Sequence, residues 1–138
     1  MKINESTSYL FYEIANRYRL DFERAMADIG LHGGQVFVLQ LLFTEDGQSQ
    51  VELAAKLKVT PPTINNMVKS LIANCFVNCE KCPDDGRVMR VYLAEKARNL
   101  EHRINSRWID FDDAFFFAFT ATEKLVMFQL LEKLKVIY

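Results

Sequence analysis

The sequence predicts a mainly α-helical protein with a small β-hairpin, arranged as a winged helix-turn-helix. Two observations carry this prediction. Residues 48–73 contain two short amphipathic helical segments, separated by a tight turn at Lys58 and Val59. Strand-forming residues then flank a polar loop, at residues 76–77 and 88–92. Helix, turn, helix and β-ribbon in this order form a winged helix-turn-helix, whose second helix enters the DNA major groove.

Both helices of the pair have recognisable starts. Ser49 can cap the first helix, with Glu52 three residues later as in a capping box. Thr60 can cap the second, and Pro61 suits the first helical position because its missing N–H has no partner there anyway. Apolar residues recur at helical spacing and predict one buried face per helix: Leu53, Ala54 and Leu57 in the first, and Ile64, Val68 and Leu71 in the second.

Further helices are predicted on both sides of this pair. Residues 8–29 form one long apolar pattern that Gly30 can end, and an apolar helix at residues 35–43 follows Gly33 and Gly34. After the hairpin, one helix spans residues 95–115 and a last one follows a capping-box pattern at Thr120. The outer helices are rich in aromatic residues. These aromatic residues predict a helical dimerisation layer at 1–30 and 96–138, beside a winged lobe at 35–95. The length of the chain suits a single domain, residues 1–138.

Composition is that of a soluble globular domain. The 138 residues are 50% hydrophobic and 25% charged, and no apolar run approaches the roughly 20 residues that span a membrane. Without a signal-peptide pattern, the expected location is cytoplasmic. Net charge is −1, but residues 56–98 carry eight basic and four acidic side chains, a local charge of +4 that leaves −5 elsewhere. This asymmetry is typical of a protein with one region that faces phosphates.

Beyond these patterns, the chain resembles the MarR family of bacterial transcriptional regulators. The resemblance is carried by VELAAKLKVTPPTINNMVKSLIANCFVNC and PDDGRVMRVYLAEKAR, with GLHGGQVFVLQLL upstream and FTATEKLVMFQLLEKL downstream. Asp85-Gly86-Arg87 matches the D-x-R signature of the wing. The resemblance implies a homodimeric, sequence-specific DNA-binding regulator, a repressor, on a palindromic operator. Its release would follow a small-molecule or an oxidant signal.

The chain departs from the family pattern at four positions. Cys75 stands where the family usually has a glycine that ends the second helix, and Gly86 replaces a frequent basic residue of the wing. Ala94 and Ala97 stand where threonine and glycine are common. These changes lower the expected charge of the wing more than they affect the fold.

Candidate DNA contacts lie on the second helix and on the wing. Asparagine can read adenine through two hydrogen bonds, and threonine and lysine suit phosphates or base edges. The resemblance places Arg87 in the minor groove; the alternative is an ion pair with Asp84 or Asp85. Arg90 would contact phosphate or support the wing. Thr60 is expected first to cap the second helix and only second to contact DNA. The full candidate set is Thr60, Pro61, Thr63, Asn65, Asn66, Lys69, Arg87 and Arg90.

The three cysteines suggest a possible redox site. Cys79 and Cys82 have the spacing of metal ligands or a redox pair. A structural zinc site normally needs four ligands, so we expect no metal. A turn that brings Cys79 and Cys82 together would allow a disulfide that re-aims Arg87, with Lys81 lowering a thiol pKa. The alternative is that Cys75 is a small core residue and the other two thiols are incidental.

The remaining motifs argue against catalysis. The chain has no Ser/His/Asp order, no phosphate loop and no paired catalytic carboxylates, so we expect neither an enzyme nor a cofactor. By the resemblance, His32 would line a pocket for a small-molecule inducer; the alternative is a surface histidine. Double-stranded DNA, a second copy of the chain and that inducer are the expected partners, and a membrane is not. Two rival functions remain: a thiol-based redox sensor, and a winged-helix protein-interaction module that does not bind DNA.

Overall fold

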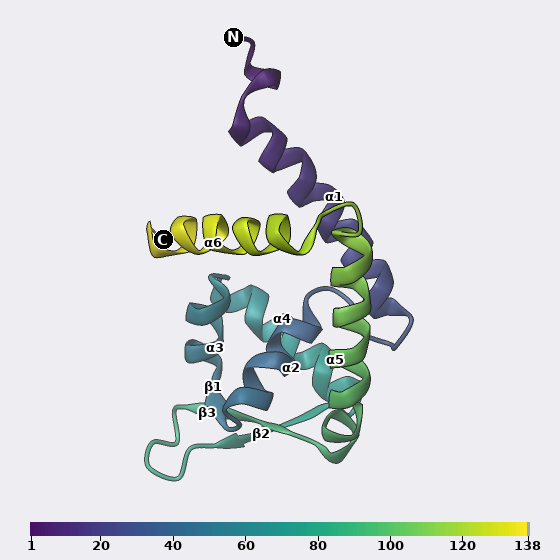
Figure 1. The fold of residues 1–138 in the computed structure, drawn as a ribbon. Coiled ribbons are helices and arrows are strands. Elements are labelled where there is room, and N and C mark those ends of the chain that lie inside the picture. Colours follow the sequence, from purple (N-terminus) through teal and green to yellow (C-terminus); the bar gives the residue numbers. More distant parts are fainter. Residues whose placement is uncertain (138) are drawn as a thin grey trace. The chain divides into compact units, whose positions relative to one another are not determined.

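The computed structural model describes residues 1–137 and confirms the predicted class, mainly α with a small sheet (Figure 1). The helices predicted at residues 8–29 and 35–43 differ from the observed helices by no more than two residues at either end. The helix predicted at 95–115 has the observed bounds. The elements are η1 (Ile3–Glu5), α1 (Thr7–Ala27), α2 (Gln35–Thr44), β1 (Gln48–Ser49), α3 (Gln50–Leu57), α4 (Pro61–Ala73), β2 (Val77–Lys81), β3 (Met89–Leu93), α5 (Glu95–Phe115) and α6 (Ala121–Ile137).

The sheet has one more strand than the hairpin that the sequence predicted. Its order is β1-β3-β2, and both pairings are antiparallel. Gln48 pairs with Val91, and Ser49 pairs with Arg90 while its hydroxyl also caps α3 by accepting from the Glu52 N–H at 3.1 Å. A two-residue strand is too short to show alternation of polar and apolar residues, so no sequence pattern predicts β1.

Buried Gln48 also explains how α2 ends against this strand. Its amide nitrogen donates to the carbonyls of Leu41 and Glu45, at 2.9 and 2.8 Å. Its amide oxygen accepts from Lys56 Nζ at 2.6 Å. The Leu41 carbonyl also accepts from the Glu45 N–H at 3.0 Å, so the Gln48 side chain adds a second bond at the end of α2 and ties that end to β1.

The chain divides into two compact units, Met1–Arg107 and the residues from Trp108 onward. The first unit contains the winged lobe, built around the central helix α2 as predicted. Helix α4 turns Ile64, Val68 and Leu71 into this core and leaves its other faces to solvent. The largest fully buried apolar side chains of the core are Met26, Leu31, Leu39, Leu42, Leu53, Ile64, Leu71 and Ile104.

The second unit is dominated by α6. The predicted capping box is present: Thr120 N–H donates to the Glu123 carboxylate at 2.9 Å, and Glu123 N–H donates to the Thr120 hydroxyl at 3.1 Å. The bonds from the Thr120 backbone and side chain lower the pKa of Glu123. Among the described residues, no helix is long and apolar enough to cross a membrane. Among its described side chains, helix α6 nevertheless leaves seven apolar ones exposed: Leu125, Val126, Phe128, Leu130, Leu131, Leu134 and Val136.

Replacing Gly47 with alanine should destabilise the winged lobe by about 1–3 kcal/mol. Gly47 has a φ of +76°, and a Cβ there would lie 2.8 Å from Cε1 of Tyr92. Gly86 is the matched control, because it has no positive φ and a Cβ there meets nothing within 4 Å. Chemical denaturation of the two variants and the wild type measures the difference. Equal unfolding free energies for Gly47→Ala and Gly86→Ala would contradict this assignment.

Candidate nucleic-acid interface

The exposed side of α4 carries most of the candidate contacts. Thr60 is the N-cap, as predicted: its hydroxyl accepts from the Thr63 N–H at 3.4 Å and lies 2.9 Å from the Thr63 hydroxyl. Pro61 occupies the first helical position. Since the apolar stripe of the helix is buried, the polar residues face solvent. Pro61, Thr63, Asn66 and Lys69 are exposed, and Asn65 is half-buried.

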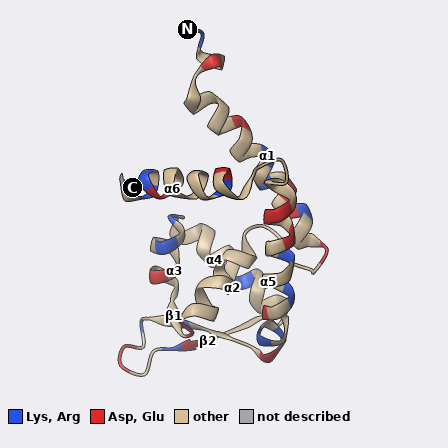
Figure 2. Cartoon of the chain, in the orientation of Figure 1, with Lys and Arg blue, Asp and Glu red and all other residues tan. Residues whose placement is uncertain are grey.

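Arg87 stands at the wing, with its side chain 93% exposed. Its backbone N–H and its Nε both donate to Oδ1 of Asp85, at 3.0 and 3.3 Å, so the ion pair foreseen as the alternative is present. Exposed ion pairs contribute little to stability. The guanidinium can therefore exchange this carboxylate for a DNA groove at small cost. The wing loop carries acidic as well as basic residues (Figure 2).

Arg90 supports the base of the wing. Its Nη1 donates to the carbonyl of Gly47 at 3.0 Å, and its Nε donates to Sγ of Cys82 at 3.3 Å. The half-buried side chain thus joins the hairpin to the turn that follows α2. Of the two roles predicted for Arg90, these contacts favour support of the wing over contact with phosphate.

The cysteines do not have the arrangement that the sequence suggested. Cys75 is exposed and is not a core residue. Its φ of +63° is the left-handed conformation that favours glycine, which fits the glycine usual at this position in the family. Cys79 lies within β2, opposite Val91, and Cys82 N–H continues the pairing by donating to the Val88 carbonyl at 2.8 Å.

An intramolecular disulfide between Cys79 and Cys82, which the sequence left open, does not fit this arrangement. Three residues of extended strand separate their Cα atoms by about 10 Å, beyond the roughly 7 Å that a disulfide spans. The thiol chemistry also differs. Arg90, not Lys81, is the main cause of the lowered pKa of Cys82, aided by bonds from the backbone of Asp84 and Asp85. Burial raises the pKa of Cys79.

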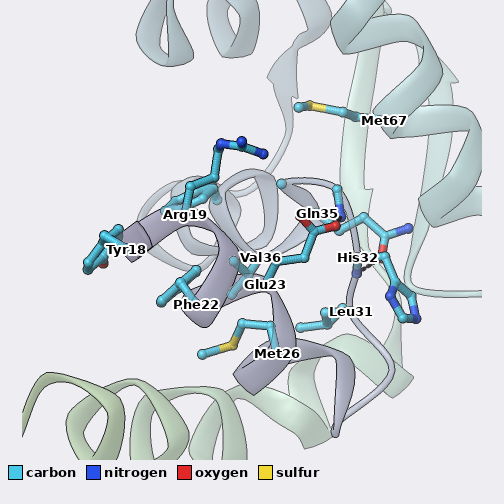
Figure 3. A pocket seen from close by; sticks show the side chains of 13 residues that line it. Tyr18, Arg19, Phe22, Glu23, Met26, Leu31, His32, Gln35, Val36 and Met67 are labelled. Atoms are coloured by element: carbon cyan, nitrogen blue, oxygen red, sulfur yellow. Dashed lines mark hydrogen bonds between the residues drawn. The ribbon is translucent and has the colours of Figure 1, made fainter. Parts of the chain in front are cut away.

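A pocket of about 390 Å³ lies between α1, the α1–α2 loop and α4 (Figure 3). Its walls are mainly apolar, with Arg19 and Glu23 as charged members. His32 lies on its wall and is itself exposed. The apolar wall residues include Phe22, Met26, Leu31, Val36 and Met67. Among residues 1–137, no three His, Cys, Asp or Glu side chains gather in a way that could hold a metal ion.

Two residues of the site, Gln35 and Ser70, were not predicted from the sequence. Gln35 is 4% exposed; its amide oxygen accepts from the His32 N–H at 2.9 Å, and its amide nitrogen donates to the Ser70 hydroxyl at 2.7 Å. Ser70 is exposed on α4. A glutamine at a helix start and a serine on a polar helix face carry no pattern of their own. Only the packing of α2 against α4 brings them together.

A three-stranded sheet, a helix-turn-helix and a wing define this chain as a winged helix-turn-helix protein. Residues 31–89 match the model of the MarR family. This match confirms, for that segment, the resemblance to the MarR family that the sequence motifs indicate. No curated protein matches the sequence.

Solved structures of similar fold cover nearly the whole chain. A MarR protein from Peptoclostridium difficile is 25% identical, with a TM-score of 0.85 over 98% of this chain and 90% of its own. The transcriptional repressor CouR, bound to a 23-mer DNA duplex, is 22% identical, with a TM-score of 0.88 over 96% and 94%. BpsR of Bordetella bronchiseptica, whose DNA binding is regulated by 6-hydroxynicotinic acid, is 20% identical, with a TM-score of 0.87 over 98% and 96%.

Proposed function

We propose that the protein is a sequence-specific DNA-binding transcriptional regulator that acts as a homodimer on a palindromic operator. The observation that carries this proposal is the polar, exposed face of α4 in a helix-turn-helix whose wing presents an exposed arginine. The CouR structure supports it, because a chain of the same fold is bound there to a DNA duplex.

In this proposal α4 enters the major groove. Asn65 or Asn66 reads an adenine, and Thr63 and Lys69 contact base edges or phosphates. Arg87 leaves Asp85 and enters the flanking minor groove, where narrow A·T tracts attract cations.

Exposed apolar side chains support the homodimer. Helix α1 leaves Leu10, Phe11 and Ile14 exposed in its amino-terminal half, and α6 leaves exposed seven apolar residues among those described. Apolar surface of this extent is typical of a subunit interface. A two-fold dimer predicts half-sites about one helical turn apart.

We further propose that a small molecule in the 390 Å³ pocket releases the operator. BpsR, which responds to 6-hydroxynicotinic acid, supports a ligand of this size. The apolar walls suit a flat, largely apolar molecule, and Arg19 suits an acidic group on it. The oxidant alternative is weaker, since the disulfide on which it depended does not fit β2.

Duplex binding measured against salt separates this proposal from the protein-interaction alternative. If Lys69 and Arg87 of both subunits meet DNA, log affinity should fall linearly with log salt, by about 0.9 for each phosphate neutralised. Fluorescence anisotropy with a labelled random-sequence duplex gives the slope, and recovery of bound genomic fragments gives the operator. An absence of duplex binding at low salt would favour a protein partner instead.

A further inference from the structure

A second hollow, of about 360 Å³, opens beside the reading face of α4. The residues that line it are His32, Gly33, Gln35, Thr63, Asn66, Met67 and Ser70. Four of these also line the inducer pocket, so the segment at His32 to Gln35 and the side chain of Met67 border both spaces. We call this hollow the His32 notch.

The notch follows one edge of α4. Thr63, Asn66 and Ser70 recur at intervals of three and four, so they form a single stripe along the helix. All three are exposed, unlike the buried stripe of the same helix. A helix in the major groove has a phosphate backbone on each side, so a stripe along its edge lies where phosphates pass.

Gln35 fixes the two walls of the notch relative to each other. Its buried amide bonds to the backbone of His32 on one wall and to the hydroxyl of Ser70 on the other. Because the Ser70 oxygen accepts from Gln35, its own hydrogen remains to be donated. The Asn66 amide and the His32 ring can donate as well, and the described residues that line the notch include no acidic one. A set of donors without a carboxylate among them suits an anion.

We propose that the His32 notch holds a backbone phosphate of duplex DNA, and that His32 binds this phosphate as an imidazolium and makes DNA affinity depend on pH. This inference rests on the proposed function and adds a contact to it. A phosphate favours the protonated ring, so DNA binding takes up a proton. Affinity then rises as pH falls through the range in which histidines titrate.

Few other charges surround the notch. On α1, Arg19 and Glu23 share the inducer pocket with His32, and the Glu23 carboxylate accepts from the Gly33 N–H at 3.2 Å. Helix α2 has no titratable side chain, and Lys69, the one on α4, does not line the notch. Since Arg19 and Glu23 are present with and without DNA, the phosphate is the charge that binding adds.

The test compares the wild type with His32→Asn, which keeps a polar side chain but cannot be charged. His102→Asn is the matched control, because His102 is the other histidine of the chain and lies exposed on α5. Anisotropy uses a random-sequence duplex, since phosphate contacts do not depend on sequence. The wild type and His102→Asn should bind about 3- to 10-fold more tightly per subunit at about pH 6 than at about pH 8. His32→Asn should lose this gain, and at about pH 6 its salt slope should fall by about 0.9 per subunit.

The outcomes distinguish a failure of this inference from a failure of the proposed DNA-binding function. A wild type that binds no duplex at either pH overturns the proposed function. A His32→Asn variant with the wild-type pH dependence and salt slope overturns only the phosphate assignment. Inorganic phosphate alone is the second probe, followed by NMR of the His32 ring. If millimolar phosphate moves these signals as far as the duplex does, the notch is a site for free anions and the assignment to the DNA backbone is wrong.

Discussion

Replacing Arg87 with alanine should weaken binding to every duplex by at least about 30-fold. A groove contact of this kind contributes about 1–3 kcal/mol, and the two-fold dimer loses it twice. The loss should be greatest where the operator is flanked by A·T-rich sequence, because the narrow minor groove there concentrates negative potential. The fold should be unaffected, since the side chain is 93% exposed and its ion pair with Asp85 adds little stability.

Arg103→Ala is the matched control for Arg87→Ala. It also removes one exposed arginine, but from α5 and not from the wing. Asn65→Ala and Asn66→Ala should have a different kind of effect from Arg87→Ala. Replacing the asparagine that reads a base should weaken sequence preference at one base pair only, by about 1–3 kcal/mol if its contact has two hydrogen bonds. Anisotropy with operators that differ in their flanks measures both effects. Equal affinities for the Arg87 and Arg103 variants would remove the wing from the proposed interface.

The features predicted correctly from the sequence are local ones. Ser49, Thr60 and Thr120 each cap a helix through a bond to the residue three positions later, and such a bond follows from residue type and spacing alone. The pair between Asp85 and Arg87 joins residues two positions apart and was foreseen for the same reason.

The features that were missed depend on contacts between distant parts of the chain. The carbonyl that holds Arg90 lies 43 residues away at Gly47, and β1 exists only because β3 returns beside it. The pocket needs α1, the loop at His32 and Met67 of α4 together. For Cys79 and Cys82 the spacing was compatible with a turn, but the sheet holds Cys79 in an extended strand.

A dimer built on α6 should dissociate when Phe128 is replaced with glutamate. Phe128 is 61% exposed in the single chain, so the substitution should leave the subunit folded. In a two-fold interface the change acts twice. Burial of a phenylalanine side chain contributes about 1.5–3 kcal/mol, so the dimer should lose about 3–6 kcal/mol, and its dissociation constant should rise about 10²- to 10⁴-fold. Operator affinity should fall with it, because two unlinked subunits no longer bind their half-sites as one ligand.

Gln129→Glu controls for the added charge, since it introduces the same carboxylate at the neighbouring exposed and already polar position. Sedimentation equilibrium at micromolar concentration should show a dimer for the wild type and for Gln129→Glu, and a monomer for Phe128→Glu. Circular dichroism checks that the helices persist. A folded Phe128→Glu protein that remains as dimeric as the wild type would place the interface away from this face of α6. A wild type that is monomeric at this concentration would remove the symmetric operator from the proposal, because each subunit would then bind a half-site alone.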